Sequence, residues 1–586
     1  YTTFSLGNGS KDSAVGKDGT GKLAANPNPG KITAVTDSSA SGSSWATGTK
    51  TYNNAVDVDV YGNPQLNLFE LAKAAGKATG NVTTAEIQDA TPAVLESHSS
   101  ERACYGPQGK TDGSSNDALK RCLASQLKEN GGIGSISEQL LDTRADVTIG
   151  GGSKYFRQTV QGGEYKGKTV WEQAKEMGFQ TVENDPAAMN ALQYKDGQPV
   201  LALMSDGNMP TKFNPSKATA KDPAKDANPT VCTPNAAWLG NQGSSLKDMT
   251  KKALDLLNAN PNGQKNGYFL QVEGASIDKQ DHAGNACGQI GETDDFDQAI
   301  AYALKSVDLN NTLVIVTADH AHTSQILNAQ PAYALSTVLK TADGNNMVVS
   351  YGTAQEDSRD EDGGYNGGDM EHTGTQLRIA ASGPGAQRVT GLTDQTDNFY
   401  TIAGALGLAT TTDAQNALSA DAEVKVAADN GAYVADADGF NGDAVLSYEL
   451  KDKNGTTVAA SDSSTPLSGV RVKTAQTTPI ALDGVTEGAE YTLTVTGRQS
   501  GKTVTVDFQA PAADSASKGD AGKDAGKNGV IASGKVDNNA KPDGPFGALG
   551  ETGTTVLAVA AAIAMLVAIA MLVKTARGAR NAKSGR

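Results

Sequence analysis

The chain has 586 residues, a formal net charge of −16, 38% hydrophobic residues and only 5% aromatic residues. This length predicts more than one domain. The acidic balance, with no basic cluster before the extreme C-terminus, argues against nucleic acid as a partner.

The first 408 residues alternate short apolar strands with helices. Strands are expected at residues 31–35, 77–84, 147–149, 200–204, 267–272 and 312–317, and helices at residues 66–75, 138–143, 169–177, 246–258, 294–307 and 395–407. Continuous apolar strands that alternate with helices are typical of an α/β domain with a largely parallel, buried sheet.

From about residue 413 the pattern changes to strands in which apolar and polar residues alternate. This predicts a small antiparallel β-sandwich, immunoglobulin-like, over residues 413–510. The range contains no histidine, cysteine or candidate site. A structural stalk is the favoured interpretation, and a carbohydrate- or partner-binding module is the alternative. Residues 511–552 are rich in small and charged residues and are expected to form a disordered linker.

The end of the chain has the composition of a membrane anchor. An apolar run of 18 residues, 556–573, predicts a transmembrane helix over residues 553–573. The basic tail, residues 574–586, is expected in the cytoplasm, which places the preceding chain outside the membrane or in the cell wall. Leu549-Gly-Glu-Thr-Gly553 is similar to the Leu-Pro-x-Thr-Gly signal of sortases, with Gly550 in place of proline. Cleavage by a sortase at Thr552 and a retained anchor are both open.

The four cysteines contain no C-x-x-C pair, which argues against a zinc finger or a thioredoxin motif. They allow three pairings, of which sequential pairing closes the shortest loops. Four free thiols are the alternative, but a location outside the cytoplasm favours bridges. Each bridge would stabilise the fold by about 2–4 kcal/mol. The cysteines are Cys104, Cys122, Cys232 and Cys287.

Histidine is scarce, and four of the five histidines lie in carboxylate-rich motifs. Glu273 follows the expected strand 267–272 and begins a stretch that ends at His282. In this stretch Asp278 and His282 are four residues apart, so on a helix they share one face. The fifth histidine, His98, lies apart in a polar helix and is expected at the surface.

Two further motifs strengthen the metal hypothesis. The strand 312–317 runs into Asp319, His320 and His322, and His372 follows a loop rich in Gly and Asp. Because sites in parallel sheets form at the carboxyl ends of strands, the motifs are expected to meet. Mixed nitrogen and oxygen ligands of this kind predict a two-metal site with a preference for zinc.

Ser38 follows Asp37 at the expected start of a helix. A hydroxyl there lies in the positive field of the helix N-terminus, and a metal could make it a nucleophile. An ordinary N-cap serine is the competing interpretation. No Gly-x-Ser-x-Gly segment surrounds it, so a triad hydrolase is not expected. Arg102 could bind phosphate bidentately, against the simpler interpretation of a surface arginine.

Long segments of residues 1–408 resemble bacterial alkaline phosphatase. This resemblance implies a three-layer α/β sandwich around a largely parallel sheet and metal-dependent hydrolysis of phosphate monoesters at alkaline pH. It is compatible with a homodimer. The matching segments are Val35-Thr-Asp-Ser-Ser-Ala-Ser41, Thr79-Gly-Asn-Val-Thr-Thr-Ala-Glu-Ile-Gln-Asp-Ala-Thr-Pro92, Gln271-Val-Glu-Gly-Ala-Ser-Ile-Asp-Lys-Gln-Asp-His282, Val316-Thr-Ala-Asp-His-Ala-His322 and Glu371-His-Thr-Gly374.

The resemblance also implies a role for each matching residue. Ser38 would be the nucleophile that becomes phosphoserine, and Arg102 would clamp two phosphate oxygens. The remaining roles concern two zinc ions and one magnesium ion. Asp278, His282 and His372 would bind one zinc, Asp319, His320 and Ser38 the second, and Glu273 and Thr91 the magnesium; Asp89 and Lys279 would act through water, His322 and Asp37 would support the ligands, and the bridges would be Cys104–Cys122 and Cys232–Cys287.

The family's first strand, which ends in Gly-Asp-Gly-Met-Gly, has no counterpart because the sequence begins after it. Its aspartate bridges the second zinc and the magnesium in the family. Residues 1–408 are therefore expected to form a catalytic domain that lacks one strand and one metal ligand. A related phosphodiesterase, or an inert surface protein such as an adhesin, remains an alternative. Ser38 and Arg102 favour the monoesterase.

Overall fold

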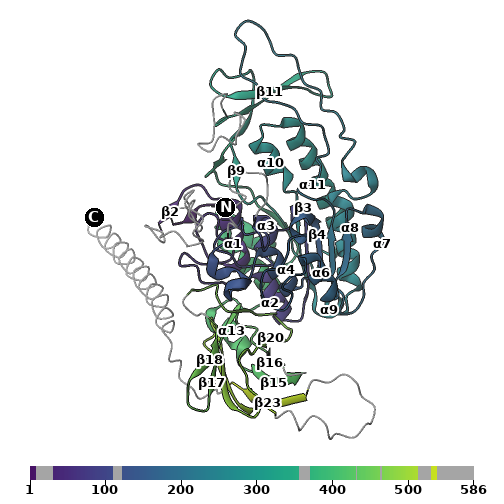
Figure 1. The fold of residues 1–586 in the computed structure, drawn as a ribbon. Helices are drawn as coiled ribbons and strands as arrows, with labels where there is room; N and C mark the ends of the chain where they lie inside the picture. Colours follow the sequence, from purple (N-terminus) through teal and green to yellow (C-terminus); the bar gives the residue numbers. More distant parts are fainter. Residues whose placement is uncertain are drawn as a thin grey trace, which may run out of the picture. The chain divides into compact units, whose positions relative to one another are not determined.

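The computed structural model describes residues 1–7, 31–109, 122–354, 370–429, 432–461, 465–511 and 529–536. Residues 1–536 form one compact unit (Figure 1). The predicted transmembrane helix, the basic tail and the motif around Thr552 lie outside the described residues. Within the described ranges, no helix has the length and apolar character needed to cross a membrane.

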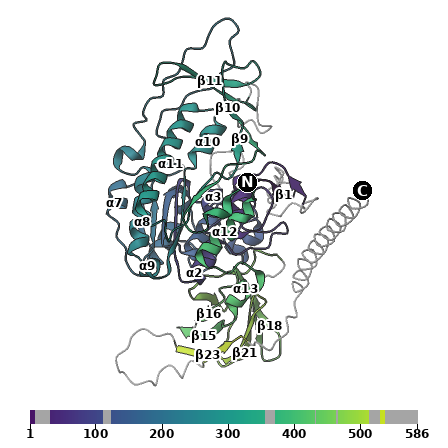
Figure 2. The ribbon, with the colours of Figure 1, turned by 180° about the vertical axis from the view of Figure 1, so that it is seen from behind.

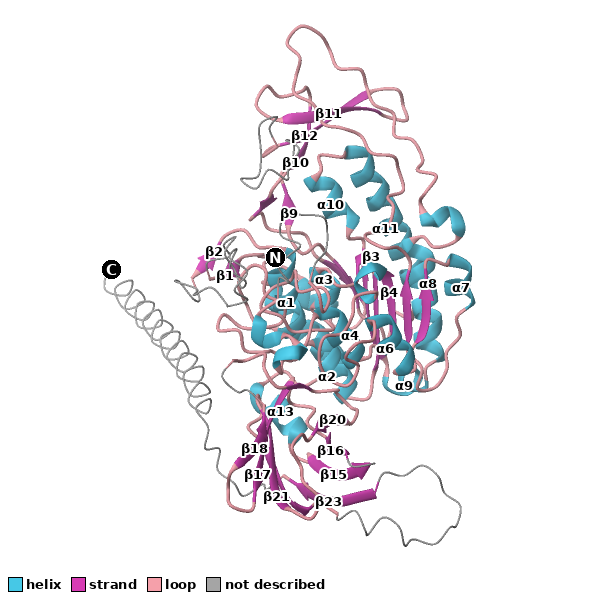
Figure 3. Ribbon diagram, viewed as in Figure 1, coloured by secondary structure: helices cyan, strands magenta, loops and turns pink. Residues whose placement is uncertain are grey.

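The centre of the first domain is a parallel sheet, in which Figure 3 labels β3 and β4. Its strand order is β5-β6-β4-β3-β7. Strand β3, which lies between β4 and β7, is buried along its whole length, as expected for a sheet covered on both faces. This confirms the predicted α/β architecture with a parallel sheet. The strands are β3 (Ala78–Glu86), β4 (Val147–Gly151), β5 (Gln180–Glu183), β6 (Val200–Leu203) and β7 (Tyr268–Glu273).

Helices cover both faces of this sheet (Figures 1 and 2). Successive side chains of a strand point to opposite faces. In β6, Val200 and Ala202 pack with helix α8 (Leu246–Ala259). Leu201 and Leu203 pack instead with the helices of the other layer. Those helices are α4 (Ile136–Thr143) and α6 (Val170–Glu176), and α2 (Leu68–Ala74) contacts β3 and β7.

Local sequence signals set where the helices begin. At the start of α2, Asn67 accepts from the amide of Glu70 while the Glu70 carboxylate accepts from the amide of Asn67. The same capping box starts α4, α6 and α8, and each satisfies amides that the helix cannot pair internally. The other elements of the domain are β1 (Ser5–Leu6), β2 (Ile32–Thr33), α1 (Ser38–Thr47), α3 (Ala90–Ala93), η1 (Ala124–Gln126), η2 (Lys128–Asn130), α5 (Ser153–Phe156), α7 (Pro186–Ala191), η3 (Leu239–Gln242), α9 (Pro261–Asn266), α10 (Ser276–His282), α11 (Ala286–Ser306), β8 (Val314–Val316), β9 (Ala321–His322), β10 (Ser324–Leu327), β11 (Leu335–Lys340), β12 (Asn346–Tyr351), β13 (His372–Thr373), β14 (Ala380–Ser382), η4 (Ala386–Val389), α12 (Gln395–Leu406), α13 (Thr412–Asn416) and η5 (Ala417–Ser419).

The strand predicted at residues 312–317 lies outside the main sheet. It forms the shorter β8, which pairs antiparallel with β14. The residues of β7 and β8 are partly exposed, unlike those of β3. The absence of a first strand from the catalytic domain stays a prediction.

Both disulfides have the predicted pairing. Cys104 is bonded to Cys122, and Cys232 to Cys287. The second bridge joins α11 to the segment before η3, beside the antiparallel sheet β10-β12-β11.

The second region is an antiparallel β-sandwich, as the alternation in residues 413–510 predicts. Its sheets have the orders β20-β16-β15-β23 and β18-β17-β21-β22, and β19 pairs with β17. The strands are β15 (Glu423–Asp429), β16 (Ala432–Asp438), β17 (Val445–Asp452), β18 (Thr457–Ala460), β19 (Val470–Arg471), β20 (Thr478–Ala481), β21 (Glu490–Gly497), β22 (Thr503–Gln509) and β23 (Gly529–Lys535).

The prediction of a disordered linker over residues 511–552 is wrong for β23. This strand lies inside the range 511–552 that composition assigns to disorder, yet it pairs with β15 along its length. Its Ile531 and Ala532 pack on the core of the sandwich. A composition averaged over a long Gly- and Ala-rich range hides so short an apolar segment.

Candidate active site

Ser38 is the first residue of α1, and Asp37 before it is the N-cap. The Asp37 carboxylate accepts hydrogen bonds from the amide of Ala40 at 2.9 Å and from the hydroxyl of Ser39 at 2.8 Å. The interpretation of Ser38 as an ordinary N-cap is therefore wrong. The Ser38 hydroxyl instead lies 2.9 Å from His320 Nε2, and both residues are buried.

A chain of alternating charges lies beside the start of α1. Arg102 Nη1 is 3.2 Å from Asp37 Oδ2, and Arg102 Nη2 is 2.9 Å from Asp89 Oδ1. Lys279 Nζ lies 2.6 Å from the other oxygen of Asp89. Burial alone would lower the pKa of Arg102 and of Lys279, but the neighbouring carboxylates raise both. The two cations stay charged, which suits them to bind an anion.

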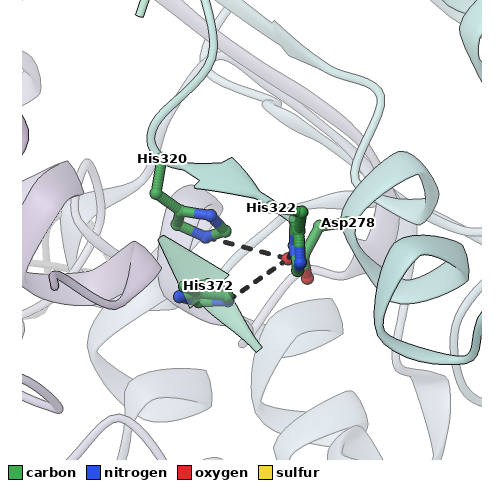
Figure 4. A group of neighbouring side chains, drawn as sticks. All are labelled: Asp278, His320, His322 and His372. Atoms are coloured by element: carbon green, nitrogen blue, oxygen red, sulfur yellow. Dashed lines mark hydrogen bonds and ion pairs between the residues drawn. The ribbon is translucent and has the colours of Figure 1, made fainter. Parts of the chain in front are cut away.

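The predicted metal ligands meet around Asp278 (Figure 4). Asp278 Oδ1 lies 2.6 Å from His322 Nε2, 3.4 Å from His372 Nε2 and 3.8 Å from His320 Nε2. His282 Nε2, one helical turn along α10, is 3.5 Å from the same oxygen. Burial would raise the pKa of Asp278, but hydrogen bonds from His322 and His372 hold it well below its usual range.

The backbone fixes two of these imidazoles. His282 Nδ1 is 2.6 Å from the carbonyl of Met370, and His372 Nδ1 is 3.0 Å from the carbonyl of Thr36. A carbonyl only accepts, so each Nδ1 carries the proton and the Nε2 of the neutral ring is an acceptor. The two Nε2 atoms nevertheless lie 3.0 Å apart. Two acceptors at this distance need a proton or a cation between them.

The donor set therefore fits a metal ion. One ligand atom from each of Asp278, His320, His322 and His372 lies within 4.8 Å of the others. Burial lowers the pKa of His320 to about 4, which keeps it in the neutral form that binds metals. Asp319 reaches the same ring, with Oδ2 at 3.2 Å from His320 Nε2. Imidazole and carboxylate ligands are typical of zinc.

The predicted magnesium ligands bond to other residues than those of this cluster. Glu273 ends β7, and its carboxylate accepts a hydrogen bond from the Thr83 hydroxyl at 2.5 Å. Burial raises the pKa of Glu273 to about 7. The carbonyl of Thr91 in α3 accepts from the side chain of Gln271, also on β7. A cation beside Glu273 would favour its charged form.

Sequence reasoning missed two groups of the site. The Tyr105 hydroxyl donates to Asp89 Oδ1 at 2.8 Å, and Thr83 binds Glu273 as described. Tyr105 lies three residues after Arg102 in the sequence. This short separation indicates that the two side chains could belong to one site. Thr83 lies on the strand that leads to Asp89, but its hydroxyl resembles any other in a β-strand.

The prediction that His98 lies at the surface is wrong. It is fully buried, and its Nε2 lies 3.0 Å from Glu70 Oε1 while its Nδ1 lies 2.9 Å from the carbonyl of Asp57. A polar stretch can be buried where each polar group finds a partner.

The chain is similar to known phosphatases over its first two thirds. A family model described as alkaline phosphatase matches residues 20–408. The chain is 50% identical to an alkaline phosphatase of Escherichia coli over 388 residues, 66% of this chain and 77% of that protein. It is equally identical to that of Escherichia fergusonii over 381 residues, 65% of this chain and 75% of that protein. It is 40% identical to a streptomycin-6-phosphate phosphatase of Streptomyces griseus over 399 residues, 65% of this chain and 80% of that protein.

Among solved structures, an alkaline phosphatase from the Antarctic bacterium TAB5 is 22% identical, with a TM-score of 0.43. The match covers 64% of this chain and 85% of that chain.

Proposed function

Because the chain belongs to the alkaline phosphatase family and is a phosphoric monoester hydrolase, we propose that it acts through a phosphoserine on Ser38. The observation that carries this assignment is the Ser38 hydroxyl, which takes no part in capping α1 and lies at His320 Nε2. Arg102 contacts Asp37, the residue before Ser38. Asp37 is thus next to the nucleophile in the chain and also contacts the phosphate-binding cation.

Metal ions complete this site in the proposal. Asp278, His282 and His372 would hold one zinc ion, Asp319 and His320 the second with Ser38, and Glu273 with Thr91 a magnesium ion. When bound, these ions supply charge that lowers the pKa of oxygen nucleophiles and stabilises the leaving oxygen. His322 and Asp37 would hold ligands in place, as the contacts of His322 with Asp278 and of Asp37 with Arg102 support.

In the proposed reaction two displacements take place at phosphorus. Ser38 Oγ loses its proton and attacks phosphorus, the new Oγ–P bond replaces the bond to the alcohol, and the alcohol leaves with the proton that Ser38 lost. A water molecule then attacks phosphorus, the Oγ–P bond breaks, and inorganic phosphate is released. Arg102 has five N–H donors, so it can bind Asp37, Asp89 and two phosphate oxygens together. Lys279 and Asp89, joined at 2.6 Å, would position water beside the phosphate.

Trapping the phosphoenzyme tests the assignment of Ser38. The protein with zinc and magnesium, quenched in acid during turnover of p-nitrophenyl phosphate, should retain phosphate on Ser38. Ser38→Ala should abolish this adduct and lower kcat by about 10³-fold or more. Ser44→Ala, the same change deeper in α1, is the matched control, because its hydroxyl donates to the carbonyl of Ala40 in the same helix. An undiminished adduct in Ser38→Ala would refute the assignment.

The alternatives are a phosphodiesterase and an inert surface protein, and the relatives favour neither. Turnover of bis-p-nitrophenyl phosphate faster than p-nitrophenyl phosphate would support the first. Bound zinc without turnover of either substrate would support the second.

We also propose that the enzyme works outside the cytoplasm, anchored by residues 553–573 or by the cell wall after cleavage at Thr552. Two disulfides support an oxidising location. Release from cells by detergent alone would support the membrane anchor, and release by a wall hydrolase would support the sortase route.

A homodimer is a further proposal, which light scattering of the purified protein would test.

A further inference from the structure

The β-sandwich shares a hydrophobic core with the catalytic domain. Ala444, Val445 and Leu467 of the sandwich are fully buried in one cluster with Leu68 and Phe69 of α2. Figure 2 shows the sandwich against the end of the domain that carries α2. A stalk that only spaces a domain from a surface needs no such core.

The two backbones also pair with each other. The amide of Ile133 donates to the carbonyl of Leu467 at 3.2 Å, and the amide of Gly469 donates to the carbonyl of Gly131 at 2.8 Å. Gly132 and Ser468 thereby form an antiparallel bridge. This segment leads directly into α4 of the catalytic domain, so the contact is continuous with its helical layer.

Arg471 places a charge in this buried contact. Its Nη2 donates to Glu70 Oε1 in α2 at 2.6 Å, and the two side chains are only 2% and 1% exposed. Nη2 also donates to the Thr143 hydroxyl of α4 at 3.3 Å, and Nη1 donates to the carbonyl of Ala444 at 3.1 Å. A buried ion pair with this many partners fixes orientation, and loss of one member leaves an uncompensated charge.

Glu70 also contacts His98, so the position of Glu70 restrains the His98 ring. The oxygen that binds Arg471 also lies 3.0 Å from His98 Nε2. The Glu70 pKa falls to about 2, because His98 and Arg471 outweigh the opposing effect of burial. His98 Nδ1 then contacts the carbonyl of Asp57. His98 is therefore held between α2 and the segment around Asp57.

The segment after His98 carries Arg102. Ser99 and Val56 exchange backbone hydrogen bonds at 2.8 and 2.9 Å, and the amide of Arg102 donates to the carbonyl of Asn54 at 2.7 Å. The amide of Asn54 donates in turn to Asp37 Oδ2 at 2.9 Å. Residues 54–57 and 98–102 thus form a pair of segments with His98 at one end and the phosphate-binding group at the other.

We propose that Arg471 is a positioning residue for phosphate binding, acting through Glu70 and His98 on the segment that carries Arg102. The sandwich is then a part of the catalytic body and not a stalk. This inference rests on the proposed function, because Arg102 must bind phosphate for the constraint to matter.

The test compares three variants of the full chain with zinc and magnesium bound. Arg471→Met removes the charge and keeps the apolar stem, and Arg471→Lys keeps the charge but loses the forked contacts. Leu493→Ala is the control, since Leu493 is fully buried in the sandwich's own core, away from the shared cluster. The measurements are kcat and KM for p-nitrophenyl phosphate and the inhibition constant of inorganic phosphate.

Arg471→Met should raise KM and the phosphate inhibition constant by about 3- to 30-fold, with a smaller change in kcat. Arg471→Lys should recover part of this loss, and Leu493→Ala should lower thermal stability without changing either constant. Hydrogen exchange of the amides 98–102 should rise in Arg471→Met and stay unchanged in Leu493→Ala.

Unchanged KM and phosphate inhibition in Arg471→Met would overturn the inference, as would equal increases in Leu493→Ala. If Arg471→Met does not fold, KM and the phosphate inhibition constant of Arg471→Lys are used instead. Unchanged values in that variant would then overturn the inference. A second check is the double variant Glu70→Met/Arg471→Met, which removes both charges; full recovery of KM there would show that only the unpaired charge mattered and would also overturn it. A native protein that does not hydrolyse the substrate would instead refute the proposed function.

Discussion

The two halves of the active site are held in different ways. Around Ser38, every charge of Asp37, Asp89, Arg102 and Lys279 has a partner of opposite charge from the chain itself. Around Asp278, the acceptor nitrogens of His282 and His372 face each other at 3.0 Å. The first half is preorganised by the fold, and the second needs a proton or a cation between these two nitrogens. We therefore expect the two halves to respond differently to metal removal and to substitution.

Metal removal should produce the largest difference. Dialysis against a chelator should abolish turnover, and zinc with magnesium should restore it. Amide exchange should rise in residues 276–282 and 370–373, where the imidazoles repel one another, and stay low in residues 38–47. Exchange that rises equally in both halves, or turnover that survives chelation, would contradict this division.

Substitution of Arg102 should break the preorganised half. Arg102→Ala leaves two carboxylates without their shared cation and removes two charge-assisted bonds to phosphate. A loss of about 10- to 100-fold in kcat/KM is expected, with zinc content unchanged by atomic absorption. Arg157→Ala is a matched control, because Arg157 pairs with Glu183 and Asp206 in a half-exposed position. Loss of zinc in Arg102→Ala would show that the halves are not independent.

The pH dependence of stability should reveal a buried acid that contacts β3 and β4. Glu96 is fully buried, and burial raises its pKa from 4.5 to about 8 despite hydrogen bonds from Asn81 and Thr148. Between these values the folded chain holds a proton that the unfolded chain has lost. The free energy of unfolding should therefore fall as pH rises from about 4.5 to about 8, by on the order of a few kcal/mol.

Glu96→Gln should remove this fall. Urea unfolding of the native protein and of the variant between pH 5 and pH 8 gives the comparison. Glu164→Gln, at an exposed position, should leave the fall intact. A Glu96→Gln variant with the same pH dependence as the native protein would show that Glu96 is not its source.

The smallest effect is expected from Tyr105. Tyr105→Phe removes one donor to Asp89, which keeps Arg102 and Lys279. Loss of one hydrogen bond predicts a decrease of about 3- to 10-fold in kcat/KM. Tyr194→Phe, whose hydroxyl donates to Asp196 at the surface, is the control. A decrease as large as that of Arg102→Ala would mean that Tyr105 does more than orient Asp89.

Local features of the site could be predicted from the sequence. The four-residue spacing of Asp278 and His282 places both on one face of α10, and the apolar strands predict the parallel sheet. These inferences depend only on neighbours along the chain. The capping role of Asp37 was missed because two adjacent residues, Asp37 and Ser38, are both good caps.

Contacts between distant segments that carry no recognisable motif could not be predicted. The pair of Arg471 and Glu70 joins residues 401 positions apart, and nothing local distinguishes this arginine from an exposed one. His98 looked like a surface residue for the same reason, since its partners come from α2 and from the segment at Asp57. The short strand β23 needed the edge of β15 to form.

Strand β23 also decides where the folded chain can be ended. It covers β15, which would otherwise present a row of unpaired N–H and C=O groups at the edge of the sheet. A protein cut at residue 511 would keep the whole catalytic domain but expose this edge to strands of other molecules. The folded chain thus includes the seven residues 529–535, and a fragment that ends before them loses the strand that pairs with β15.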